Sequence, residues 1–129
     1  MRQRYAYWVA TCLLSLLYLG SATMYVLKSD FARQSFAALG YPGYLVAILP
    51  VVKVLGVLAV LSRRSLFLSD LAYAGMLYHL LLALSAHLNA HDGGFVPAVA
   101  GLLLLVTSFL TQNSARAKQS PYAPSTPPN

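Results

Sequence analysis

Two ionisable side chains, Lys53 and His79, lie inside consecutive apolar segments that are each long enough to cross a membrane. An ionisable group in hydrocarbon is costly unless it meets a partner or a water-filled cavity, so such residues mark candidate functional sites. Insertion scales assign about +2.5 to +3.5 kcal/mol to a lysine at the centre of a transmembrane helix. The aliphatic residues around Lys53 offset this cost, so we expect the segment to insert with Lys53 facing a helix bundle.

The chemistry open to this pair is proton exchange or anion binding. Small residues recur at three- and four-residue steps around His79, which predicts a close helix contact and places His79 toward Lys53. Two like charges in a low dielectric are not both protonated, a property that suits proton exchange. Tyr18 and other tyrosines can add hydroxyls, so the candidate intramembrane site comprises Lys53, His79, Tyr73, Tyr78 and Tyr25.

The alternative interpretation of these residues is structural. Lys53 then serves as a polar contact inside the bundle, with the Val46 carbonyl released by Pro50 as one acceptor. His79 would be neutral and bonded to a tyrosine or a backbone carbonyl. The residues alone leave both interpretations open.

A second polar group lies where the third apolar segment ends. His87 and His91 are one helical turn apart and Asp92 follows, a spacing that can place ligands on one metal ion. Asn89 and the glycines at 93 and 94 indicate that the helix ends here, and no metalloprotease-type motif accompanies the pair. His87, His91 and Asp92 are therefore only a weak metal candidate, and we predict no metal site.

Known enzyme signatures do not occur in the chain. It has no catalytic triad, paired carboxylates, P-loop or dinucleotide-binding glycine motif, and its single cysteine, Cys12, cannot form an intrachain disulfide. We therefore do not expect a stand-alone enzyme. Asp70, near one end of the third segment, is expected to bond locally to Arg63 or Arg64.

The composition identifies the elements that must position these residues. Of 129 residues, 58% are hydrophobic and 9% are charged, whereas soluble domains carry about a quarter charged residues. The sequence predicts an all-α integral membrane four-helix bundle over residues 1–112, with a short amphipathic helix after the first span. The expected spans are 5–27, 43–61, 66–88 and 94–111.

The net charge of +6 reports topology and lipid contact, because most Lys and Arg residues flank the spans. No basic stripe with exposed aromatics occurs, so we expect no nucleic-acid partner. The positive-inside rule places both termini and the Arg63–Arg64 loop in the cytoplasm. Residues 113–129 are rich in Pro and Ser and are predicted to form a disordered cytoplasmic tail.

Three phrases carry a resemblance to a known family: the opening YAYWVATCLLSLLYLGSATMYVLK, LGYP followed by a span with K-x-x-G (Lys53 to Gly56), and AYAG…SAH before NAHDGG. With these the chain resembles the DoxX-like family of small four-helix bacterial membrane proteins. The family's namesake is the small membrane subunit of an archaeal thiosulfate:quinone oxidoreductase, and related proteins are linked to membrane redox complexes or to assembly of other membrane proteins. The family often has a glycine near the end of its first span, where this chain has Ser21-Ala22-Thr23.

The resemblance implies a multi-pass protein of the bacterial inner membrane, in contact with lipid and with other membrane proteins or further copies of itself. We expect an accessory subunit of a quinone-linked redox system, with its polar site around Lys53 and His79 and no resident cofactor. A bound quinone or lipid is the ligand class that such a site could take. The alternative is a non-catalytic assembly or chaperone-type protein for other membrane proteins.

Overall fold

The computed structural model describes residues 2–91, 93–116 and 118–125 of the chain. Four of its helices are long and apolar enough to span a membrane, which confirms the predicted all-α, membrane-type bundle. A shorter helix, α2, lies between the first two of these, and a 3₁₀ turn, η1, follows the last. The elements are α1 (Arg2–Leu27), α2 (Ser29–Ala38), α3 (Leu45–Ser62), α4 (Leu66–Ala90), α5 (Phe95–Thr111) and η1 (Gln112–Ala115).

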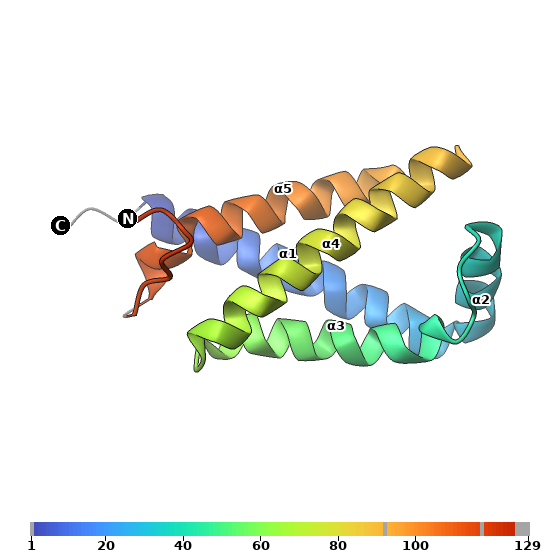
Figure 1. The fold of residues 1–129 in the computed structure, drawn as a ribbon, viewed down its shortest axis with the longest axis horizontal. Coiled ribbons are helices and arrows are strands. Elements are labelled where there is room, and N and C mark those ends of the chain that lie inside the picture. Colours follow the sequence, from blue (N-terminus) through green and yellow to red (C-terminus); the bar gives the residue numbers. More distant parts are fainter. Residues whose placement is uncertain (1, 92, 117, 126–129) are drawn as a thin grey trace.

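The four long helices form a ring in which α1 and α4 each pack against both α3 and α5. Figure 1 shows the start of α1, the α3–α4 turn and the end of α5 at one end of the bundle, which we call the termini end. Helix α2 and the α4–α5 turn lie at the opposite end, which we call the α2 end. This alternation is what four consecutive spans with short connections produce.

Local sequence explains where the helices begin and end. Gly40 and Gly93 adopt φ values of +84° and +75°, a left-handed conformation that costs glycine little, in the connections after α2 and α4. The hydroxyl of Ser65 accepts a hydrogen bond of 3.2 Å from the backbone N–H of Leu68, so Ser65 caps the start of α4. The turns at Ser65 and Gly93 join long helices that run antiparallel, whereas the turn at Gly40 leads from α2, which lies across the end of the bundle, into α3 (Figure 1).

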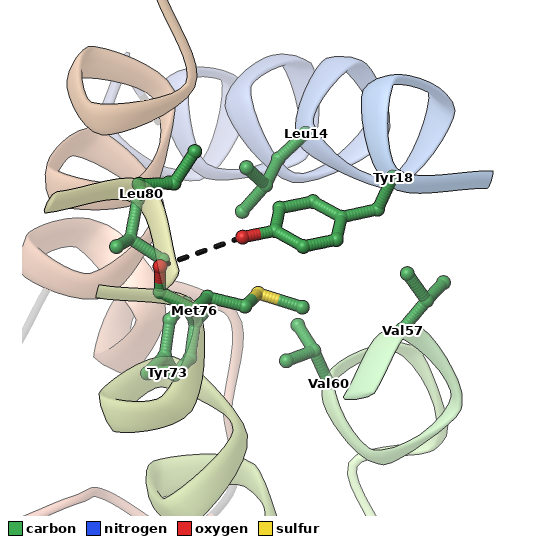
Figure 2. Packing of buried hydrophobic residues seen from close by; sticks show 8 residues of the cluster. Leu14, Tyr18, Val57, Val60, Tyr73, Met76 and Leu80 are labelled. Carbon is green, nitrogen blue, oxygen red and sulfur yellow. Dashed lines mark hydrogen bonds between the residues drawn. The ribbon is translucent and has the colours of Figure 1, made fainter. Parts of the chain in front are cut away.

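The core lies where the four helices meet. Figure 2 shows the ring of Tyr18 extending from α1 toward α4 between Leu14 and Met76, with its hydroxyl 3.4 Å from the Met76 carbonyl oxygen. Because lipid is as apolar as these side chains, shape complementarity rather than burial from water stabilises such packing. The core residues are Leu14, Tyr18, Val57, Val60, Tyr73, Met76, Leu80 and Leu105.

Helix α2 covers part of the α2 end. Ala32 is buried, and the ring of Phe36 stands edge-on to Tyr25 of α1 with 5.5 Å between ring centroids. Phe31 is exposed on the outer surface, where an apolar side chain can enter lipid. The helix therefore lies against the bundle through one side and meets the membrane interface with another.

The described part of the predicted tail contacts the termini end. The Asn113 side-chain amide lies 3.0 Å from the Ser120 carbonyl and 3.2 Å from that of Ala123, and its oxygen accepts a 2.7 Å bond from the Ser120 N–H. Residues 126–129 lie outside the described residues, and disorder of the tail stays a prediction. The expected membrane-domain boundary at residue 112 coincides with the start of η1.

The prediction that Asp70 bonds to Arg63 or Arg64 was wrong. Its Oδ2 accepts a hydrogen bond of 2.9 Å from the Ser120 hydroxyl rather than one from Arg63 or Arg64. Arg63 instead lies over the Trp8 ring at 4.9 Å and donates to the Ala115 carbonyl. Arg63 thus satisfies the Ala115 carbonyl at the end of η1, and the tail supplies a donor to one carboxylate oxygen of Asp70. The other oxygen, Oδ1, is buried with no hydrogen-bond partner among the described residues.

Candidate intramembrane site

Lys53 lies in the interior of the bundle, with 5% of its surface exposed. Its Nζ donates a 2.6 Å hydrogen bond to the Ser21 hydroxyl of α1. The same nitrogen lies 4.1 Å from the centroid of the Tyr25 ring, a distance typical of a cation–π contact. The ammonium is therefore held by α1 rather than by the Val46 carbonyl considered from the sequence.

His79 approaches the same region from α4. Its Nδ1 lies 3.0 Å from the Tyr18 hydroxyl, and the two rings are 5.5 Å apart. The Tyr18 ring is also 5.9 Å from Lys53 Nζ. Tyr18 thus lies between the lysine and the histidine and contacts both, so the three side chains form one polar cluster.

Helical spacing explains why one face of α1 supplies most of this environment. Tyr18, Ser21 and Tyr25 are three and four residues apart, so they project from the same side of α1. Lys53 comes from α3 and His79 from α4, so the cluster joins three helices. We refer to Tyr18, Ser21, Tyr25, Lys53 and His79 as the polar cluster.

A cavity of about 620 Å³ extends from the polar cluster toward the α2 end. This volume is within the range of about 300–1,000 Å³ found for ligand pockets. Its walls are mostly apolar and come from several helices, including Met24 of α1, Phe31 and Phe36 of α2, and Pro97 of α5. The cavity therefore combines mostly apolar walls with a few polar groups, as small-molecule sites do.

Two of the predicted site residues lie elsewhere. The Tyr73 hydroxyl is 2.7 Å from Ser108 of α5, whose hydroxyl is in turn 2.6 Å from Thr11 of α1. Tyr78 is 76% exposed on the outer surface of α4. The structure thus brings together Lys53, His79 and Tyr25. Tyr73 lies apart from them, and exposed Tyr78 shares only the hollow between α3 and α4 with Lys53 and His79.

His87 and His91, two of the three residues considered as weak metal ligands, lie in different environments. His87 borders the cavity, whereas His91 is the exposed left-handed residue after α4 and Asp92 lies outside the described residues. Within the described ranges, no three His, Cys, Asp or Glu side chains are arranged to hold a metal ion.

The small residues of α4 have a different role from the predicted close helix contact. The buried face of α4 carries Ser69, Tyr73, Met76 and Leu80, one face at three- and four-residue steps. Ala72 and Gly75 lie beside this face and border a hollow between α3 and α4. Ala72 and Gly75 therefore border open space between α3 and α4.

Ser21 is the site residue that sequence reasoning missed. In the sequence, Ser21 belongs to Ser21-Ala22-Thr23, where the resemblance to the DoxX-like family implies a glycine. The available signal was its helical phase, because Ser21 shares a face with Tyr18 and Tyr25.

Comparison with known proteins finds one matching family. The model of the DoxX-like family matches residues 9–109, which include all four long helices in whole or in part. No curated protein and no solved structure gives a significant match to the chain.

Proposed function

The chain belongs to the DoxX-like family, and on this premise we propose that it is an accessory subunit of a membrane redox system that binds a quinone at its polar cluster. The observation that carries the proposal is the buried Lys53 side chain on the wall of a mostly apolar cavity. A buried cation in a membrane segment is retained at a cost, which favours a functional role.

The donors of the polar cluster match the acceptors of a quinone. An ammonium has three N–H donors, and Ser21 is the one hydrogen-bond acceptor that Lys53 contacts among the described side chains. A quinone carbonyl oxygen is an acceptor that fits such a donor. The flat ring of a quinone would lie among the aromatic and aliphatic walls, where Tyr25 and Phe36 already stand edge-on.

Reduction of a quinone to a quinol consumes two electrons and two protons. In the proposed system the electrons come from a partner protein, and the protons are taken up at the two carbonyl oxygens. Lys53 and the imidazole of His79 are the groups of the cluster suited to carry protons. This chain would therefore hold the quinone and move protons while the partner supplies the reducing equivalents.

Lys53→Met tests the proposal, because methionine keeps much of the side-chain volume and removes every N–H donor. Purified protein in lipid nanodiscs is titrated with decylubiquinone, and bound quinone is extracted and quantified. We expect affinity to fall at least tenfold, since a hydrogen bond to a charged donor contributes about 1.5–3 kcal/mol. Lys28→Met is the matched control, because Lys28 is exposed and does not line the cavity. Equal binding by the two variants would contradict the proposal.

A further inference from the structure

A second hollow, of about 500 Å³, lies between α3 and α4 and reaches the polar cluster from another side. Tyr18, Lys53 and His79 line both this hollow and the cavity toward the α2 end. We call the second hollow the α3–α4 groove. Three side chains of the polar cluster therefore border both spaces.

The α3–α4 groove faces the lipid side of the bundle. Leu55 of α3 and Leu71 of α4, both of which line it, are exposed on the outer surface. Tyr78 stands at the same surface and also borders the groove. In a bilayer this surface meets acyl chains, so the groove connects the hydrocarbon region with the polar cluster.

Small residues keep the groove open. A Cβ added at Gly75 would have no heavy atom within 4 Å, and one added at Gly56 would meet only the Met76 methyl group, at 3.4 Å. Ala59 and Ala72 line the same space. A larger side chain at Gly75 would therefore project into free volume and would not displace the backbone.

We propose that the α3–α4 groove is the route by which the ligand enters from the bilayer, and that the ligand's aliphatic tail remains in it. This inference rests on the proposed function. The head group would lie at Lys53 and His79, and the tail would extend between α3 and α4 into lipid. The ligand class is thus a molecule with an acceptor-bearing ring and a long flexible hydrocarbon tail. We infer a tailed ligand because the groove is bordered by polar-cluster side chains and by residues of the lipid-facing surface.

A photolabelled quinone tests the location of the tail directly in the unaltered protein. A ubiquinone analogue with a diazirine at the end of its alkyl tail is bound in nanodiscs and irradiated, and the labelled residues are identified by peptide mass spectrometry. We expect labelling on the groove-lining residues, such as Leu55, Leu68 and Leu71, that is lost when excess decylubiquinone competes. Competed labelling confined to cavity residues such as Phe36 and Ala98, which do not line the groove, would overturn the inference and leave the proposed function intact. Absence of any competed labelling would contradict the proposed function itself.

Two glycine substitutions provide an independent test. Gly75→Leu fills the groove, and Gly20→Leu fills the cavity, since a Cβ at Gly20 also has no atom within 4 Å. We expect Gly75→Leu to weaken decylubiquinone binding at least tenfold and to change binding of the tail-less ring, 2,3-dimethoxy-5-methylbenzoquinone, less than twofold. Gly20→Leu should weaken the binding of decylubiquinone and of the tail-less ring alike. Unchanged decylubiquinone binding by folded Gly75→Leu would overturn the inference.

Discussion

The Tyr18 hydroxyl of α1 lies 3.0 Å from Nδ1 of His79 on α4. Either atom can donate, depending on the tautomer of the imidazole. In both cases one ring nitrogen of His79 is engaged, and the orientation of the imidazole is set by α1. Tyr18 therefore couples the histidine to the helix that also holds Lys53 through Ser21.

Tyr18→Phe should weaken quinone binding through His79. The phenyl ring keeps its packing, but the hydroxyl that orients the imidazole is lost, so we expect affinity to fall about three- to tenfold. The measurement is a double-mutant cycle with His79→Leu, read out as decylubiquinone affinity. If Tyr18 acts by positioning His79, Tyr18→Phe will have no further effect in the His79→Leu background. Additive losses would show that the two side chains act independently.

Ser108→Ala should destabilise the bundle and leave quinone binding unchanged. The substitution removes two buried hydrogen bonds, to Thr11 and Tyr73, and leaves their hydroxyls without that partner. We expect the free energy of unfolding to fall by about 1–2 kcal/mol. Unfolding in mixed detergent micelles measures this change.

Thr107→Ala is the control for Ser108→Ala on the same helix. Thr107 is exposed, and its hydroxyl donates to the Leu103 carbonyl of its own helix turn at 2.8 Å. Its loss should change stability by less than about 0.5 kcal/mol. Equal effects of the two substitutions, or weakened quinone binding by Ser108→Ala, would show that the hydrogen bonds joining Thr11, Tyr73 and Ser108 do not serve stability alone.

Asn113→Ala should release the described part of the tail. The Asn113 side chain contacts the backbone of Ser120, Ala123 and Pro124, so one substitution removes several hydrogen bonds. We expect trypsin to cleave after Lys118 several times faster than in the unaltered protein, because cleavage requires local opening of the chain. Asn89→Ala, at an exposed position near the end of α4, serves as control. Equal cleavage rates for the unaltered protein and Asn113→Ala would contradict anchoring of the tail by this residue.

The orientation in the membrane follows from charge. Arg2, Arg4, Arg63 and Arg64 belong to the termini end, whereas Lys28 and Arg33 lie in the connection at the α2 end. The positive-inside rule then predicts a cytoplasmic termini end. Alkaline phosphatase should be inactive when fused after Arg64 and active when fused near Gly40. The reverse pattern would invert the orientation and place α2 in the cytoplasm.

The sequence predicts those features of the fold that depend on local periodicity and on the membrane. Four apolar segments bounded by polar turns determine four spans, because the bilayer tolerates few other structures. Lys53 and His79 could be identified as unusual for the same reason, since a charge is conspicuous among aliphatic residues. The predicted spans agree with the helices to within a few residues, except that α1 begins at Arg2.

The side-chain partners could not be predicted in the same way, because they depend on the rotation of each helix against its neighbours. Tyr78 is next to His79 in sequence, but consecutive helical residues project about 100° apart, so Tyr78 faces outward. Tyr73 faces inward toward α5 and meets Ser108 instead of Lys53. Ser21 contacts Lys53 from another helix, a pairing that no spacing along the chain reveals.

The most direct test of the central claim is native mass spectrometry of the protein extracted gently from its own membranes. We expect the unaltered chain and Lys28→Met to retain a small molecule with the mass of a quinone, and Lys53→Met to lose it. Retention of that mass by Lys53→Met, or a stoichiometric partner protein with no small molecule in any variant, would contradict quinone binding at Lys53. The second result would favour a role in the assembly of that partner.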